Sequence, residues 1–470
     1  MTNHSPDPDF HRQDLWSAIE NGAYPKWKFG IQTIPEANEH DFEFDILDAT
    51  KVWPEELVPI RYIGTLELNR NPDEFFTQTE QVAFCTSHVV PGIGFSDDPL
   101  LQGRNFSYQD TQLSRLGINW EELPINKPVC PVMNHNRDGA MRHTITKGTV
   151  NYWPNRFEAA PPATASEGAY IDYPQKVAGI KARTKSKKFR EHINQAELFY
   201  NSMSAPEQAH ITAALGFELD HCDDPVVYKR MCERLTEVNL ELAQAVADMV
   251  GADIPTESKR QSHGKKAKGL SQTEYAPITP TIATRRVAIL IAEGFDSVAY
   301  YGMKAALTAA GALPYTIGPK RNTIYAAGES KESGKGVIPD HHLEGMRSVM
   351  FDSLYIPGGA QSVQTLTKNG RATHWVREAF GHLKAIGASG EAVTFVKTAV
   401  GLPGVEFSAT SEVKESYGVV TVGQVEADSW KEKVEMVKGA SSFMATYFYA
   451  ISMHKNFDRE MDGLASMVAY

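Results

Sequence analysis

The stretch Asp97–Gly117, DDPLLQGRNFSYQDTQLSRLG, carries the clearest local signal in this sequence. Asp98 followed by Pro99 is typical of a helix start, because the aspartate oxygen accepts a free N–H group and proline has none to satisfy. Gly117 is typical of the residue that ends a helix. We therefore predict a helix over residues 99–116.

Four side chains fall on one face of this predicted helix, at positions i, i+4, i+7 and i+11: Arg104, Tyr108, Thr111 and Arg115. In one interpretation the arginines pair with acids on a solvated face, and Tyr108 is a half-buried core residue. In the other, Arg104 stabilises Tyr108 as a phenolate, because a nearby positive charge favours the ionised form. A tyrosinate can be the axial ligand of haem iron. Arg115 would then hold a haem propionate, and Gly103 would let a flat macrocycle approach the backbone.

The surrounding sequence favours the second interpretation. The run GRNFSYQDTQLSRLG resembles the proximal haem-ligand signature of the haem catalases. Further segments resemble catalase in the same order: DPDFHRQDLWSAIENGAYPKWKFGIQ (7–32), FDILDATKVWP (44–54), LELNRNPDEFFTQTEQVAF (66–84), PINKPVCPVMNHNRDG (124–139) and NYWPN (151–155). The resemblance covers about residues 6–253 and continues into a C-terminal domain that is typical of large-subunit catalases.

This resemblance implies a haem catalase that dismutates hydrogen peroxide to water and oxygen in oxidative-stress defence, and that assembles as a homotetramer. Tyr108 would be the axial iron ligand, and Arg104 would be its catalytic partner on the proximal side. Arg115, Thr111 and Phe84 would contact the haem, whose type the sequence leaves open.

The resemblance also suggests a covalent link between Cys85 and Tyr108, because some large-subunit catalases carry such a bond at the corresponding positions. The alternative is that Cys85 is a buried free thiol, as most lone cysteines are.

Catalases also use a distal histidine and a distal asparagine, because a base must move a proton between the two peroxide oxygens. By resemblance both belong to a part of the barrel that would precede Met1, and none of the fifteen histidines stands in the family's distal context. An inactive, truncated catalase-like subunit therefore remains an alternative. A third hypothesis is an amidotransferase-like activity of the C-terminal domain.

The expected fold class is α+β. We expect a catalase core over residues 1–165, with a partial antiparallel β-barrel and a wrapping arm that contains the haem-ligand helix, and a helical domain over 166–253. Apolar residues at spacings of three and four predict helices over 190–253, the last of them one helix over 226–251 that ends at Gly251. Near the C-terminus a long helix is expected over 430–454. A linker over 254–283 precedes an α/β flavodoxin-like (glutamine amidotransferase-like) domain over 284–470. Apolar runs predict barrel strands at Trp27–Gln32, Phe42–Leu47 and Arg61–Leu68.

From Arg285 onward, short apolar strands alternate with helices, which predicts a parallel sheet covered by helices on both faces. Relatives of this domain place a nucleophilic cysteine at a strand-to-helix turn, with a glutamate nearby. Glu293 could be that glutamate, but AIGASGEA (385–392) puts Ala388 where the cysteine is expected. Without a thiolate we expect this domain to be structural.

Composition excludes several classes of function. The formal net charge of −11 argues against nucleic acid as a partner, and no apolar run reaches the roughly 18 residues of a membrane helix. The four cysteines show no CxxC pair, which argues against a zinc site or a disulfide scaffold. The N-terminus lacks the apolar run of a signal peptide and the C-terminus lacks a Ser-Lys-Leu signal, so we expect a cytoplasmic protein.

Overall fold

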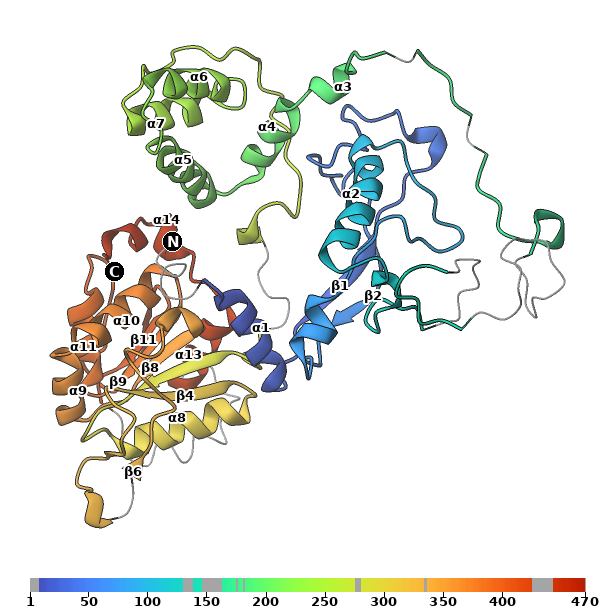
Figure 1. Ribbon diagram of the computed structural model, residues 1–470. Helices are drawn as coiled ribbons and strands as arrows, with labels where there is room; N and C mark the ends of the chain where they lie inside the picture. Colours follow the sequence, from blue (N-terminus) through green and yellow to red (C-terminus); the bar gives the residue numbers. More distant parts are fainter. Residues whose placement is uncertain are drawn as a thin grey trace. The chain divides into compact units, whose positions relative to one another are not determined.

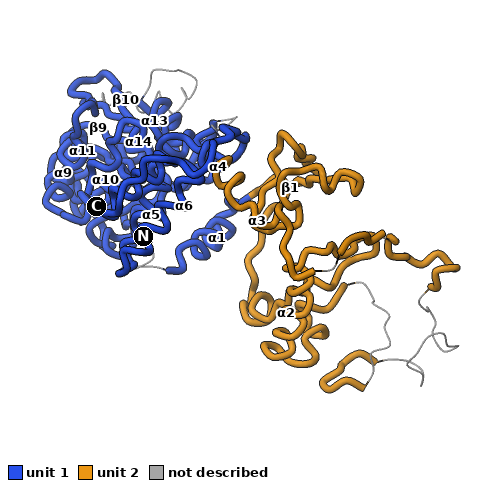
Figure 2. Tube along the Cα trace, turned by 90° about the horizontal axis from the view of Figure 1, so that it is seen from above, with its two compact units in different colours: residues 1–25, 199–470 blue, residues 26–198 orange. Residues whose placement is uncertain are grey.

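The computed structural model describes residues 8–129, 138–145, 163–174, 176–180, 182–274, 280–333, 336–424 and 443–469. The chain forms two compact units, one of residues 26–198 and the other of residues 1–25 with 199–470 (Figure 2). The NYWPN segment and the first part of a helix expected over 430–454 lie outside the described residues.

In the unit of residues 26–198, strands β1 (Lys26–Ile31) and β2 (Arg61–Glu67) pair antiparallel, with an irregularity between Phe29 and Gly30. Two of the expected strands are thus confirmed, as a two-stranded sheet. The expected strand Phe42–Leu47 is wrong, because the Asp45 side chain accepts the N–H of Leu47 at 3.0 Å and holds the chain in a turn. The described residues of this unit contain this one two-stranded sheet, which does not close a barrel by itself.

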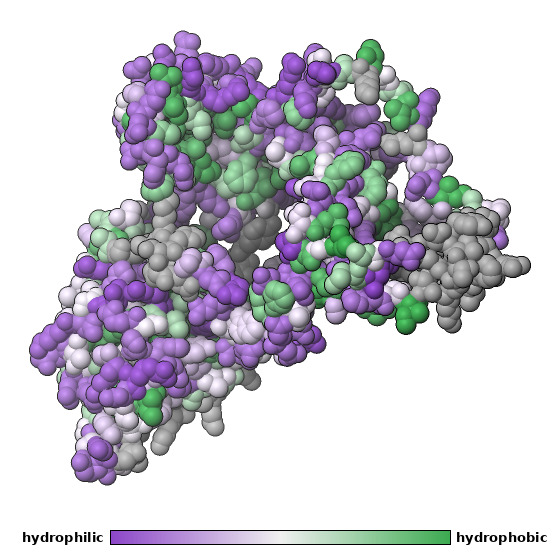
Figure 3. Space-filling model, in the orientation of Figure 1, coloured by the Kyte–Doolittle hydropathy of each residue, from purple (hydrophilic) through white to green (hydrophobic). Residues whose placement is uncertain are grey.

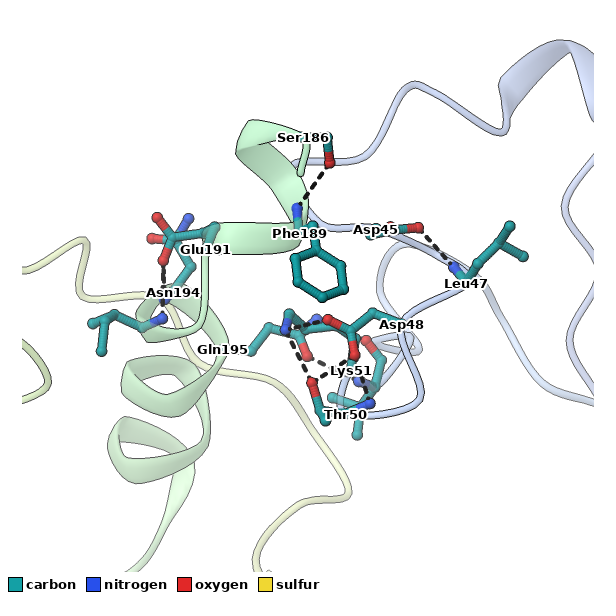
Figure 4. Close-up of polar contacts among 12 residues, drawn as sticks. Asp45, Leu47, Asp48, Thr50, Lys51, Ser186, Phe189, Glu191, Asn194 and Gln195 are labelled. Carbon is teal, nitrogen blue, oxygen red and sulfur yellow. Dashed lines mark hydrogen bonds and ion pairs between the residues drawn. The ribbon is translucent and has the colours of Figure 1, made fainter. Parts of the chain in front are cut away.

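The loop between these strands is fastened to residues far along the chain, within the same unit. The Gln195 side chain accepts from Val52 N and donates to Val52 O, both at 2.8 Å. Lys51 lies beside it with its side chain 4% exposed, 3.0 Å from Asp48 Oδ2 (Figure 4). Burial raises the pKa of Asp48, but hydrogen bonds from Thr50 and Lys51 outweigh it and lower that pKa to about 2.

Many large apolar side chains of this unit are exposed, and Figure 3 shows several of them in green over its surface. They include Phe29, Tyr62 and Leu66 on the two strands, Phe106 on helix α2 (Pro99–Arg115), and Phe84. Phe106 is 78% exposed. A two-stranded sheet offers too little area to bury such residues, so the described residues of this unit form no large core.

The other unit contains the helices expected over 190–253, with one difference. Helices α4 (Ile193–Ser202), α5 (Ala205–Leu219), α6 (Pro225–Leu235) and α7 (Leu240–Val250) follow one another. The run expected as one helix over 226–251 is two, because the Asn239 side chain accepts the N–H of Leu242 and caps α7. Gly251 ends α7 with φ +70°, as predicted.

The C-terminal part contains a seven-stranded sheet in the order β10-β11-β9-β8-β3-β4-β7 (Figure 1). Its strands are β3 (Arg286–Leu290), β4 (Leu313–Gly318), β7 (His341–His342), β8 (Ser353–Ile356), β9 (Ala385–Ser389), β10 (Lys414–Ser416) and β11 (Val419–Val422). The expectation of an all-parallel sheet is corrected at one edge, since β10 pairs antiparallel with β11.

Helices cover both faces of this sheet, as predicted. They are α8 (Ser297–Ala309), α9 (Ala360–Thr367), α10 (Gly370–Gly381), α11 (Ala392–Val400) and α13 (Phe443–Ser452). Successive side chains of β3 point to opposite faces of the sheet. Ala288 and Leu290 pack with α9, α10 and α11, whereas Val287 and Ile289 pack with α8 and α13. The period of two along a strand thus accounts for a core on each face. Shorter helices are α1 (Phe10–Glu20), α3 (Lys187–Arg190) and α14 (Asp458–Met461).

Lys384, at the start of β9, gives this domain a predicted pH dependence. Burial, more than any neighbouring charge, lowers the pKa of Lys384 to about 8, while its Nζ donates to Ser348 O at 3.1 Å. The unfolded chain therefore binds more protons between pH 8 and 10.4, and stability should rise with pH across this window. We expect Lys384→Met to remove this gain, which amounts to about 3 kcal/mol.

Hydrogen exchange of the β8 and β9 amides at pH 7, 8.5 and 10 measures this effect, with rates corrected for intrinsic pH dependence. The exposed Lys414 provides the control variant, Lys414→Met. Equal pH dependence of wild type and Lys384→Met would contradict the prediction.

Candidate functional site

Helix α2 spans Pro99–Arg115, as predicted from its sequence. Asp98 is its N-cap, and Asp98 Oδ1 accepts the N–H of Leu100 at 2.9 Å. Gly117 follows the helix with φ +116°, a conformation that glycine adopts without strain. Both end signals in the sequence are therefore confirmed.

The predicted stripe lies on the open side of this helix. Arg104, Thr111 and Arg115 are exposed, and Tyr108 is half-buried. A Cβ built on Gly103 would meet nothing within 4 Å, so the helix backbone is open to a flat ligand there. One residue from the stripe, Gln112 is the buried residue of α2.

The segment of residues 80–86 runs along α2 and is held by side chains from the helix. It begins at Glu80, the last residue of a short π-helix (Phe76–Glu80), and continues through a turn at Gln81 into residues 82–85, which have no regular secondary structure. Gln112 Nε2 donates to Phe84 O at 3.2 Å, and Thr86 Oγ1 lies 2.7 Å from Asn105 Oδ1. Arg115 Nη1 donates to Glu80 O at 2.9 Å. We call residues 80–86 the helix-bound segment.

The guanidinium of Arg115 is largely engaged by these contacts. Besides Glu80 O, it donates to Val82 O at 2.6 Å and to Gln112 Oε1 from both Nε and Nη2. These bonds use four of its five N–H groups. The structure thus gives Arg115 a role that the sequence did not reveal, and any propionate contact would have to use the remaining N–H.

Phe84 and Cys85 lie beside the tyrosine, as expected for this site. The Phe84 ring meets the Tyr108 ring edge to face, with centroids 5.9 Å apart. Cys85 is 8% exposed; its Sγ lies 3.0 Å from Ser87 Oγ and 3.8 Å from Oε1 of Gln109, the residue after Tyr108. The link between Cys85 and Tyr108 stays a prediction.

The C-terminal domain brings Glu293 and the glycine turns to the carboxyl edge of its sheet. Glu293 pairs with Lys320 at 3.0 Å and accepts the N–H of Tyr325. Ala388 lies within β9, and Gly390, with φ +61°, lies in the strand-to-helix turn that follows.

Ser389 is enclosed rather than poised for chemistry. It is 1% exposed and its hydroxyl lies 2.8 Å from Tyr355 Oη. Gly359 approaches the chain at Gly294–Asp296 closely, and its backbone N–H donates to Glu391 Oε2 at 2.9 Å.

Two features are absent from the described residues. Among them, no helix is long and apolar enough to span a membrane. They also contain no group of three or more His, Cys, Asp or Glu side chains that could hold a metal ion. An iron carried by a macrocycle, with a single protein ligand, does not require such a group.

Comparison with known proteins gives three family matches along the chain. Residues 2–159 match the catalase family, residues 186–250 the catalase-related immune-responsive family, and residues 285–446 the DJ-1/PfpI family. The order of these matches follows the order of segments expected from the sequence.

Individual relatives extend over nearly the whole chain. It is 65% identical to Catalase-1 of Neurospora crassa over 464 residues, which is 99% of this chain and 62% of that protein. It is 62% identical to Catalase A of Aspergillus fumigatus, with 99% and 63% covered. Catalase HPII of Pseudomonas aeruginosa is 42% identical, with 86% and 57% covered. The chain spans about three fifths of the length of these relatives.

The chain thus combines a catalase part with a DJ-1/PfpI part. The long matches to named catalases run through both of these parts of the chain.

Proposed function

We propose that this chain forms the haem-bearing proximal side of a catalase, which converts hydrogen peroxide into water and oxygen. The observation that carries the proposal is Tyr108 on the open face of α2, within the segment that matches the catalase family. In this dismutation one peroxide molecule is reduced to water while a second is oxidised to oxygen.

The residues present fit a haem. Tyr108 offers an oxygen donor of the kind that binds haem iron, with the exposed Arg104 one turn before it and Thr111 one turn after it. The face beside them is open at Gly103, and Phe84 borders it with an exposed aromatic ring. When bound, the haem supplies the redox chemistry of iron. The protein's part on this side is to hold the phenol oxygen that would bind the iron.

The further details of the site and of the assembly are part of the proposal. Arg104, Thr111, Arg115 and Phe84 surround the haem, the protein is a homotetramer, and it works in the cytoplasm. The type of haem is left open.

Purified protein tests the proposal directly. We expect an intense Soret absorption band and rapid oxygen evolution when hydrogen peroxide is added. A colourless protein that takes up no added haem and evolves no oxygen would overturn it. An active C-terminal amidotransferase would instead hydrolyse glutamine, which we do not expect.

Cys85 leads to a separate prediction. It lies buried, with its thiol 3.8 Å from the amide oxygen of Gln109, the residue after Tyr108. We expect peptide mapping of the haem-loaded protein to recover a cross-linked pair of peptides that contain Cys85 and Tyr108. Recovery of both peptides unmodified would end this idea without affecting the assignment of the iron ligand.

A further inference from the structure

Gln112 is held at both ends of its side-chain amide. It is 3% exposed, its Oε1 accepts from Arg115 Nε at 3.2 Å and Nη2 at 2.8 Å, and its Nε2 donates to Phe84 O. These partners define the orientation of the amide, because a flipped amide would face the guanidinium with N–H groups and the carbonyl with its oxygen. Gln112 therefore joins Arg115 to the helix-bound segment in one network.

Backbone groups of the helix-bound segment form hydrogen bonds on two sides. The carbonyls of Glu80, Val82 and Phe84 bond to side chains of α2. Between them, Gln81 O accepts from Asn126 Nδ2 at 3.0 Å and Ala83 N donates to Asn126 Oδ1 at 2.7 Å. A slip by one residue would turn every second carbonyl away from its partner, so these bonds define the register of the segment.

That register decides which side chain meets Tyr108. With Phe84 O on Gln112, the Phe84 ring lies edge-on against the Tyr108 ring and Cys85 lies against Gln109. Gln112 itself is one helical turn beyond Tyr108, on the side toward the segment. The Gln112 amide does not contact the Tyr108 ring in these bonds; it influences the surroundings of the tyrosine by holding Phe84 and Cys85 in place.

We propose that Gln112 is a positioning residue, which holds the helix-bound segment in register and thereby fixes the surroundings of the Tyr108 phenol oxygen. The proposal rests on the proposed function for its spectroscopic consequence, since that oxygen is the expected iron ligand. Its structural consequence, the protection of Cys85, is independent of haem.

Two variants separate the packing and the hydrogen-bonding roles of this side chain. Gln112→Met keeps its length and volume but removes both bonds. Gln112→Glu keeps the acceptor for Arg115 and removes the donor to Phe84 O. The matched control is Gln102→Met, which makes the same chemical change on the same helix, where the side chain of Gln102 donates to Ser96 O on the exposed surface.

The first measurement is thiol labelling of Cys85 in haem-free protein, quantified by peptide mass spectrometry. We expect labelling about tenfold faster than in wild type for both Gln112 variants, as loss of a buried hydrogen bond promotes local opening. Gln102→Met should label at the wild-type rate. Wild-type rates in Gln112→Met and Gln112→Glu would overturn the proposal whether or not the protein binds haem.

The second measurement is the vibrational spectrum of the iron–phenolate bond in haem-loaded protein. We expect both Gln112 variants to shift or broaden the phenolate band at wild-type haem content, which a role in overall stability would not do. An unchanged band would overturn the positioning role. A wild-type protein without any phenolate band would instead contradict the proposed function, while the labelling result would still stand.

Discussion

Replacing Tyr108 with phenylalanine is expected to remove haem from the protein and oxygen evolution with it. The substitution deletes the oxygen that we assign as the iron ligand but keeps the ring that packs edge-on against Phe84. The fold should therefore survive while haem affinity falls by at least about 100-fold, more than the loss of an outer partner of a metal ligand usually costs. The Soret absorbance per mole of purified protein measures the effect.

The control is Tyr62→Phe, which deletes the same atom from an exposed tyrosine on β2. It should keep the wild-type haem content, and the circular dichroism of both variants should match that of wild type. Tyr108→Phe protein that retains haem with an unchanged spectrum would refute the ligand assignment, and with it the main support for a catalase.

The second large effect is expected at Gly359, in the turn between β8 and α9. Its φ is +110°, and a Cβ there would collide with Gly294 O and lie 2.8 Å from Phe295 Cα. Gly294 O and Phe295 Cα belong to the backbone of the loop after β3, so they cannot move aside as a flexible side chain would. We expect Gly359→Ala to lower the free energy of unfolding of the C-terminal domain by more than about 3 kcal/mol.

Gly370→Ala is the matched control, because Gly370 begins α10 and a Cβ there would meet nothing within 4 Å. It should leave stability unchanged or raise it slightly, by up to about 1 kcal/mol. Thermal unfolding of both variants, together with hydrogen exchange in β3 and β8, gives the comparison. If the Gly359→Ala protein is as stable as the Gly370→Ala protein, the close approach of the two loops does not contribute to the free energy of unfolding.

The tyrosine helix could be predicted from sequence because its signals are local. Asp98, Pro99 and Gly117 determine its ends through bonds and dihedral angles within a few residues. The same holds for the strands β3, β8, β9 and β11 of the C-terminal sheet, whose apolar runs are buried. The helices over 190–253 were found for the same reason, except that a local cap at Asn239 divides one of them.

Phe42–Leu47 is apolar enough for a strand, yet a local bond from the N–H of Leu47 to the Asp45 side chain holds it in a turn. Other features that the sequence does not reveal depend on partners far away in the chain. Arg115 lies on the predicted stripe, but its carbonyl acceptors are 33 and 35 residues away. Gln112 lies one residue off that stripe, and no pattern distinguishes it from an ordinary surface glutamine.

The way in which the helix-bound segment is held has an evolutionary consequence. Side chains of α2 hydrogen-bond to the main-chain carbonyls of Glu80, Val82 and Phe84, and every amino acid has such a carbonyl. Substitutions at these positions can therefore accumulate without dislodging the segment, as long as Gln112 and Arg115 persist. Descendants of such a chain could sample new neighbours for the tyrosine, one mutation at a time, on an unchanged scaffold.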